Sequence, residues 1–317
     1  MMDGRSDMKK IPVWIDTDIG VDDSVALLVA CYLDELDIVG VSAVAGNTSL
    51  ANAFRNARDV LALAGRKDIR VYSGADRPLV KELFKAEYVH GNNGLGGAEI
   101  AHSDAPVEET KAWDALYEAA QKYSGELVVC SLGPMTNIAT AIAKHPNIID
   151  HIKVLNAMGG CADGGNITPC AEFNVYVDPH AAENVFKSGL KVNLFGLDVT
   201  HKAFLDDDDI NEITAMGNRA SDLFKDSNGL LYAWRERLNW TGLCEHDSCP
   251  IIYTVHPEWF EGKDCAIYAE TDGRITEGKT VTDLWTDFKF EDRHCRFFLN
   301  VDREKFTGLI KEAYRSY

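Results

Sequence analysis

Four aspartates near the N-terminus are the group of residues best suited to chemistry. Asp16, Asp18, Asp22 and Asp23 lie within eight residues, directly after an apolar run at 11–15 that predicts a buried strand. Carboxylates this close raise one another's pKa, so protons or a metal ion must neutralise them. Because every side-chain ligand is an oxygen, the expected ion is a hard cation, Ca²⁺ or Mg²⁺.

Three other interpretations of this segment can be tested against its residues. A first helical turn of acids explains Asp22 and Asp23 through the helix dipole, but it leaves the two earlier aspartates unexplained. An EF-hand loop starting at Asp16 needs Gly at its sixth position and Glu at its twelfth, where Val21 and Leu27 stand. A phosphatase of the haloacid-dehalogenase type has D-x-D-x-T/V, where this chain has Gly20 at the last position. It stays as an alternative.

Alternating apolar runs and helical segments are expected to position the aspartates. Strands are predicted at 11–15, 38–45, 127–130, 152–158 and 192–197, and helices at 24–33, 50–64, 133–144 and 179–187. This alternation is typical of βαβ crossovers. We therefore predict an α/β fold with a single open, mostly parallel, Rossmann-like sheet and helices on both faces.

The pattern changes after residue 205. An acidic run at 206–209 predicts the start of a helix, and 210–238 predicts one or two helices. Further strands are expected at 267–269 and 296–301, with a closing helix at 304–314. No linker interrupts residues 11–317, so one domain is expected there, preceded by a disordered or tag-like segment at 1–10.

Composition excludes several classes of protein. The 317 residues are 46% hydrophobic, which is too apolar for disorder, and the formal net charge of -18 repels nucleic acids and anionic membranes. Without a signal peptide or membrane span, a cytoplasmic location is expected. The eight cysteines are scattered and suit reduced thiols. Cys244 and Cys249 could suggest zinc, but no second ligand pair follows at a suitable spacing.

The aspartate segment resembles a hallmark of the nucleoside hydrolases, which cleave the N-glycosidic bond of ribonucleosides. That hallmark, D-x-D-x-G-x-D-D, is matched by residues 16–23. Other family landmarks follow in the family's order: Gly46-Asn47, His90-Gly91 with Gly94-Leu95-Gly96, 132–137 (Leu-Gly-Pro-Met-Thr-Asn), Met158-Gly159-Gly160, Asn166, Glu172-Phe173-Asn174 and His246-Asp247. The resemblance covers residues 11–255 and implies a homodimer or homotetramer acting on a small-molecule ribonucleoside.

The resemblance also implies a ligand set for the metal and the ribose. A Ca²⁺ ion would be held by Asp18, Asp23, Asp247 and the backbone carbonyl of Leu132. Adjacent helical residues point about 100° apart, so Asp22 would instead bind a ribose hydroxyl. The remaining ribose contacts implied by the resemblance are Asn47, Met158, Asn166, Glu172 and Asn174. No Arg or Lys clamp accompanies these motifs, so nucleosides rather than nucleotides are the expected substrates.

Charge explains how such a site would act. The ribose becomes oxocarbenium-like as the glycosidic bond breaks, and carboxylates stabilise that positive charge. Asp18 is the expected general base for the attacking water, and His246 and His90 are the candidate proton donors to the base. The candidate base contacts are Tyr232, Trp234 and Trp240.

The residue directly before Asp247, the last of the aspartates implied to bind the metal, differs between branches of the family. His246 at this position resembles the base-nonspecific and pyrimidine-preferring branches, whereas the purine-specific branch has Trp there. Trp240 nearby leaves purine stacking open. A ribose-binding protein without turnover and a metal-dependent phosphatase remain as alternatives; the first would have lost activity despite the intact Asp18.

Overall fold

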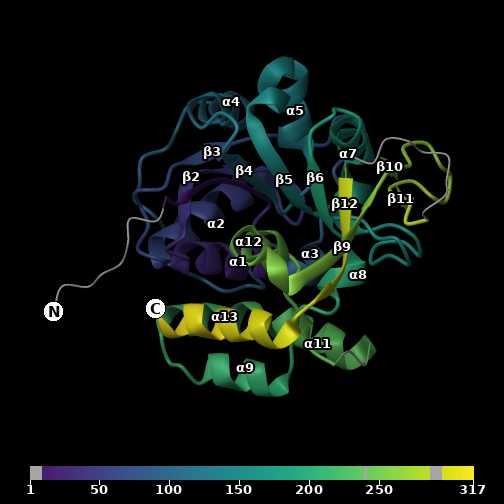
Figure 1. Cartoon of the computed structure of the whole chain (residues 1–317). Coiled ribbons are helices and arrows are strands. Elements are labelled where there is room, and N and C mark those ends of the chain that lie inside the picture. The colour runs from purple at the N-terminus through teal and green to yellow at the C-terminus, as the bar shows by residue number, and fades with distance from the viewer. Residues whose placement is uncertain (1–8, 239–240, 286–294) are drawn as a thin grey trace.

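An eight-stranded sheet forms the centre of the protein (Figure 1). The computed structural model describes residues 9–238, 241–285 and 295–317, so most of the predicted N-terminal segment 1–10 lies outside the described residues. In order across the sheet, the strands are β3 (Val71–Ser73), β2 (Leu36–Ala43), β1 (Ile11–Thr17), β4 (Leu127–Ser131), β5 (Ile152–Met158), β6 (Val192–Phe195), β12 (Cys295–Val301) and β9 (Phe260–Cys265).

All neighbouring strands are parallel except the edge pair β12 and β9, which is antiparallel. The prediction of a mostly parallel sheet is therefore confirmed. Strands β3 and β9 were not predicted from the sequence. The first has only three residues, and the second reads Phe-Glu-Gly-Lys-Asp-Cys, with polar residues on an edge that solvent can reach.

Helices cover both faces of the sheet, as predicted (Figure 1). One apolar core lies under α1 (Val21–Tyr32), α2 (Leu50–Leu63), α10 (Arg219–Ser227), α12 (Ser248–Val255) and α13 (Arg303–Arg315). The other lies under α4 (Ala112–Lys122), α5 (Thr136–Lys144) and α7 (Pro179–Phe186). Because both faces are covered, central strands such as β4 are buried along their whole length and read as continuous apolar runs.

The direction of strand addition reverses beside β1. The chain adds β2 and β3 on one side of β1, and β4, β5 and β6 on the other. In an open parallel sheet, the carboxyl ends of the strands leave a crevice at such a switch point. Asp16, near the end of β1, is paired in register with Ser42 of β2 and Ser131 of β4. The aspartate segment therefore emerges where a ligand crevice is expected.

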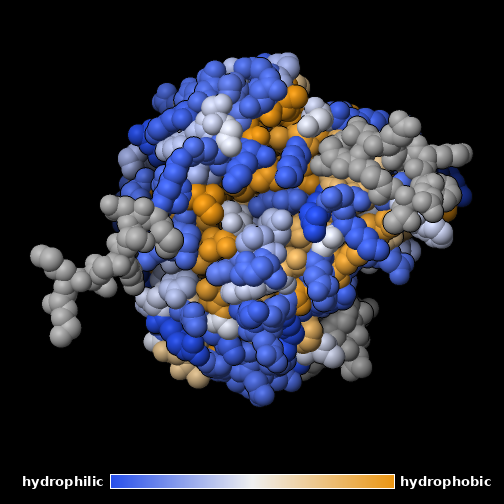
Figure 2. All heavy atoms as spheres, in the orientation of Figure 1, coloured by the Kyte–Doolittle hydropathy of each residue, from blue (hydrophilic) through white to orange (hydrophobic). Residues whose placement is uncertain are grey.

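Residues 206–238 form three helices where one or two were predicted: α9 (Asp207–Thr214), α10 and α11 (Gly229–Leu238). The first break falls at Gly217, whose φ is 65°, and Asn218 then caps α10. The acidic run does begin a helix, with Asp206 as the N-cap. Arg303 of α13 pairs with both Asp206 and Asp209, and hydrophilic residues cover this part of the surface in Figure 2.

The remaining elements are short. They are α3 (Glu87–His90), α6 (Phe173–Val177), α8 (Leu197–Thr200), two 3₁₀ turns (Pro146–Asp150 and Pro257–Trp259), and the two-stranded pairs β10 (Ile267–Ala269) with β11 (Thr280–Thr282) and β7 (Phe204–Leu205) with β8 (Leu243–Cys244). Among the described residues, no helix has the length and apolar character needed to cross a membrane. None of the eight cysteines, all within the described residues, forms a disulfide.

Candidate active site

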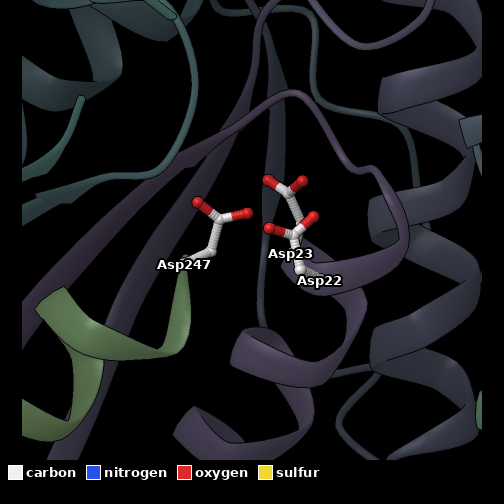
Figure 3. A group of neighbouring side chains, drawn as sticks. All are labelled: Asp22, Asp23 and Asp247. Atoms are coloured by element: carbon white, nitrogen blue, oxygen red, sulfur yellow. The ribbon is translucent and has the colours of Figure 1, made fainter. Parts of the chain in front are cut away.

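Three carboxylates from distant parts of the chain meet beside the switch point. Asp22 and Asp23 lie in the first turn of α1, and Asp247 is the residue directly before α12. Helices α1 and α12 pack against each other, which brings the carboxylates together. One ligand atom from each lies within 4.8 Å of the others, and the carboxylates face one another in Figure 3. An acidic group of this kind could bind a metal ion.

Asp18 lies next to this group and is fully buried. Its Oδ2 accepts the backbone N–H of Asn47 at 2.6 Å, whereas its Oδ1 has no hydrogen-bond partner among the described residues. A buried carboxylate oxygen without a partner is costly unless a cation or a ligand completes its contacts. Gly46 and Gly133 let the backbone approach closely, because a Cβ at either position would lie within 2.6 Å of an Asp18 carboxylate oxygen.

The electrostatics of the cluster are unfavourable in the absence of a cation. Burial, followed by the charge of Asp23, raises the pKa of Asp22 to about 7. Burial and the neighbouring carboxylates likewise raise the pKa values of Asp18 and Asp247 well above the usual range. A divalent cation would supply the missing positive charge, and an all-oxygen donor set fits a hard ion such as Ca²⁺. The residues therefore fit the predicted metal.

Local hydrogen bonds hold Asp23 in place. Its Oδ1 accepts the hydroxyl of Thr17 at 2.5 Å, and its Oδ2 accepts the backbone N–H of Gly20 at 2.7 Å. The side-chain amide of Asn47 donates to the same Oδ2 at 3.1 Å. Asn47 is thus brought into contact with both Asp18 and Asp23, as expected for a residue of the same site.

Asn174 connects the ends of β4 and β5. Its side-chain amide donates to the carbonyl of Leu132 at 2.7 Å and to the carbonyl and sulfur of Met158, each at 3.3 Å. Glu172 is buried, and its carboxylate caps α6 by accepting the backbone N–H groups of Asn174 and Val175, and that of Gly160. These four predicted residues therefore lie together.

Asn166 is the predicted ribose contact with the most exposed position. It lies on the loop before α6, and its side-chain oxygen accepts the backbone N–H of Phe173 at 2.9 Å. Because Phe173 directly follows Glu172, this hydrogen bond places Asn166 beside Glu172. In this arrangement its side chain holds the loop.

Two histidines, the buried His90 and the half-buried His246, lie near the carboxylates. The Nδ1 atom of His90 accepts the backbone N–H of Val21 at 3.1 Å, and Nδ1 of His246 is 2.7 Å from the Thr200 hydroxyl. Burial lowers the pKa of His90 to about 4 and is the main cause lowering the pKa of His246 to about 3. The ring of His201 meets that of His246 edge to face, with centroids 5.7 Å apart. Both predicted proton donors are thus uncharged at neutral pH.

Comparison with known proteins identifies the family. The family model for inosine-uridine preferring nucleoside hydrolases matches residues 13–308. The chain belongs to this family. It is therefore a ribonucleoside hydrolase, as the sequence motifs predicted.

Relatives of this nucleoside hydrolase match it over nearly their whole length. The pyrimidine-specific ribonucleoside hydrolase RihA of Photobacterium profundum is 36% identical over 310 residues, which cover 96% of this chain and 99% of that protein. RihA of Escherichia coli (strain K12) is 34% identical over 309 residues, 97% of this chain and 99% of that protein.

Solved structures of nucleoside hydrolases share the fold. The plant nucleoside hydrolase PpNRh1 superposes with a TM-score of 0.91 at 29% identity and covers 97% of this chain and 99% of its own. A purine-preferring ribonucleoside hydrolase from Gardnerella vaginalis has a TM-score of 0.89 at 28% identity, over 96% of this chain and 100% of its own. The name of the second structure gives a purine preference, whereas the RihA relatives are named as pyrimidine-specific.

The predicted base contacts of the nucleoside hydrolase are only partly described. Tyr232 lies half-buried on α11, which packs against α3, the helix that ends at His90. Burial raises the pKa of the Tyr232 phenol, and the nearby Glu245 adds to this. Trp240 and the side chain of Trp234 lie outside the described residues, so their predicted contacts stay predictions.

Sequence reasoning did not single out Thr17, Thr200 or Glu245. Glu245 is buried, its Oε2 has no partner among the described residues, and burial and the charge of Asp22 raise its pKa well above the usual range. The sequence did carry a signal for this residue, because a glutamate stands there directly after apolar residues and directly before His246. The two threonines carry no such signal, because their importance comes from contacts with distant residues.

A cavity of about 790 Å³ lies away from the carboxylates. Its lining includes Lys191, Asn193 and Arg296, near the beginnings of β6 and β12, and it contains none of the predicted site residues. The carboxyl ends of the parallel strands lie at the opposite edge of the sheet. This cavity therefore lies away from the chemistry of this enzyme.

Proposed function

We propose that this ribonucleoside hydrolase is Ca²⁺-dependent and prefers pyrimidine ribonucleosides, which it converts to free base and ribose in nucleoside salvage. The observation that carries the proposal is the acidic cluster of Asp22, Asp23 and Asp247 beside the unpartnered Oδ1 of Asp18. The pyrimidine preference is supported by the names of the RihA relatives and by His246, which precedes Asp247.

Asp18, Asp23, Asp247 and the carbonyl of Leu132 would hold the ion in this proposal. The Leu132 carbonyl accepts one hydrogen bond from Asn174, and a carbonyl oxygen has a second lone pair for a cation. Asp22 would bind a ribose hydroxyl, together with Asn47, Asn174 and the other ribose residues. When bound, Ca²⁺ would orient and acidify the attacking water and hold the ribose.

The reaction needs one water and leaves the enzyme unchanged. The water oxygen forms a bond to C1′ of the ribose as the C1′–N bond breaks, and the bonding electron pair leaves with the base. Asp18 takes a proton from the water, and the departing base receives a proton by way of His246 or His90, which would face it. Asp18 then returns its proton to solvent, which replaces the proton given to the base and restores the enzyme. The buried carboxylates stabilise the positive charge that develops on the ribose between these events.

Charge also supports nucleosides over nucleotides as substrates. The carboxylates that would surround the ribose repel a 5′-phosphate, and the described contacts of the predicted ribose residues include no Lys or Arg side chain. A carboxylate-rich pocket without such a side chain suits a nucleoside better than a phosphate monoester. The proposal therefore predicts release of reducing sugar and no release of phosphate.

The decisive experiment measures reducing sugar and free phosphate separately, with uridine, cytidine, inosine and p-nitrophenyl phosphate as substrates. The expected result is reducing sugar from uridine and cytidine, less from inosine, and loss of activity in EDTA that Ca²⁺ restores. Faster inosine hydrolysis would overturn the pyrimidine preference, activity in EDTA would overturn the metal dependence, and phosphate release alone would overturn nucleoside hydrolysis.

We also propose that the enzyme acts in the cytoplasm as a homodimer or homotetramer. Light scattering on the purified protein tests the subunit number. A monomeric mass would overturn that part of the proposal and leave the chemistry untouched.

A further inference from the structure

His90 and His246 differ in the group that contacts their Nδ1 atoms. Nδ1 of His90 is 3.1 Å from the backbone nitrogen of Val21, and a backbone N–H can only donate. The Nδ1 atom of His90 is therefore an acceptor, and the proton of the uncharged ring lies on Nε2. His90 thus presents a hydrogen-bond donor through Nε2.

The partner of His246 is a hydroxyl, which can donate or accept. Thr200 Oγ1 lies 2.7 Å from Nδ1 of His246, and Thr200 is fully buried. The hydroxyl has no other hydrogen-bond partner among the described residues. If Nδ1 carried the ring proton, the Thr200 hydroxyl hydrogen would be left buried without an acceptor, which is unfavourable for a polar group. The alternative, in which Thr200 donates to Nδ1, satisfies both groups.

The Thr200 hydroxyl is held firmly in this position. Thr200 is the last residue of α8, and its backbone N–H donates to the carbonyl of Gly196 at 3.1 Å. A β-branched side chain in a helix has few χ1 choices, so the hydroxyl direction is restricted. On the other side, the edge-to-face contact with His201 limits rotation of the His246 ring.

We infer that Thr200 is a positioning residue that places the ring proton of His246 on Nε2. His246 and His90 then present the same tautomer, one held by a hydroxyl and the other by a backbone amide. This inference rests on the proposed function, in which these histidines face the departing base. Two Nε2–H donors would stabilise the electron pair that the base carries away as the C1′–N bond breaks.

The first test reads the tautomers directly and does not depend on turnover. Long-range ¹H–¹⁵N correlation spectra of the Ca²⁺-loaded protein distinguish a ring protonated on Nε2 from one protonated on Nδ1. The expected result is an Nε2–H ring for both histidines, and loss of this state in Thr200→Val for His246 alone. A His246 ring protonated on Nδ1 in the wild-type protein would overturn the inference.

The second test compares two substrates. Thr200→Val should lower kcat/KM for uridine by about tenfold or more, since a buried hydrogen bond to the ring is lost. It should change kcat/KM for p-nitrophenyl riboside, whose leaving group needs no such help, by less than about twofold. Thr200→Ser keeps the hydroxyl and should stay close to wild type. Thr307→Val, a buried threonine on α13, is the matched control.

The outcomes separate this inference from the proposed function. Unchanged uridine hydrolysis by Thr200→Val, or an equal loss on both substrates, would overturn the positioning role while nucleoside hydrolysis stands. A wild-type protein that shows the Nε2–H ring but hydrolyses neither substrate would overturn the proposed function and leave the tautomer assignment in place. Retained activity in Thr200→Ser would support the inference, because this variant changes the side chain at residue 200 but keeps its hydroxyl.

Discussion

The carboxylate side and the histidine side of the candidate active site are built in different ways. Asp18, Asp22 and Asp23 come from one short segment after β1, and backbone N–H groups of Gly20 and Asn47 hold two of them. The two histidines come from α3 and from the residue before Asp247, and each Nδ1 has one hydrogen-bonding partner. The carboxylate side is therefore anchored to the sheet, while the histidine side depends on contacts between separate helices and loops.

This difference separates two tasks. Ribose cleavage needs charge at fixed positions, which the ends of buried strands provide. Base preference needs a surface that can vary without disturbing that charge, and loops and short helices tolerate such variation. The relatives agree with this division, since proteins whose names give pyrimidine or purine preference share this fold. Substitutions on the two sides should therefore have different effects.

The largest effect is expected on the carboxylate side. Asp18→Asn should lower kcat for uridine by about 10⁴-fold, the upper end for loss of a general base, because it also removes a charge from the ribose pocket. The asparagine keeps an oxygen, so calorimetry should still detect Ca²⁺ binding by a folded protein. Asp68→Asn, at a surface ion pair, is the control. Turnover close to wild type with Ca²⁺ bound would remove Asp18 from the mechanism.

On the histidine side, the effect should depend on the leaving group. His246→Ala should lower kcat for uridine by about 10²–10³-fold, within the range for loss of a general acid or donor, and leave p-nitrophenyl riboside nearly unchanged. Steady-state kinetics on both substrates provide the measurement. An equal loss on both would mean that the variant disturbs Asp247 or the ribose, and a Ca²⁺ titration would tell which.

Pocket charge predicts a smaller effect on substrate choice. Uridine 5′-monophosphate should have a kcat/KM about 10²-fold below that of uridine, which corresponds to about 2.7 kcal/mol of transition-state binding. The comparison is made at fixed ionic strength with phosphatase activity excluded. Similar rates for the two substrates would mean that a basic group lies close to the ribose 5′ position.

The smallest predicted effect is on the stability of the metal-free protein. Burial raises the pKa values of Asp16 and Asp22 to about 7, whereas in the unfolded chain they titrate near their usual range. The folded state thus holds protons that the unfolded state releases, so this stability is present at low pH and is lost as pH rises toward 7. The lowered pKa values of His90 and His246 act in the opposite direction, but the buried carboxyl groups with raised pKa values, which include Asp18 and Asp247, outnumber them.

Calorimetric melting in EDTA at several pH values tests this dependence. Tm should fall between pH 5 and 8 by about 2–4 °C for each kcal/mol lost, and Ca²⁺ should reverse the fall because it binds the ionised carboxylates. Loss of the Ca²⁺ effect in Asp247→Ala would assign it to the cluster. A Tm in EDTA that rises over this pH range would contradict the electrostatic description of the site.

Local sequence alone determined the βα alternation and the position of the aspartates. Buried parallel strands read as continuous apolar runs, and acids directly after the first run lie at the carboxyl edge of the sheet by geometry alone. The predicted strands at 11–15, 127–130 and 152–158 correspond to β1, β4 and β5 for this reason. Strand β9 could not be predicted in this way, because its polar residues are stable only as an edge paired with β12.

Only the tertiary structure decided which distant residues meet. Asp247 joins Asp22 and Asp23 because α12 packs on α1, although the two helices lie far apart in the chain. Thr200 reaches His246 because β7, just after α8, pairs with β8, just before His246. Such contacts leave no periodic signal in the sequence, since hydrophobic spacing reports which face of an element is buried and not which partner covers it. The residues of the acidic cluster were therefore predictable from motifs, while the groups that hold the histidines required the fold.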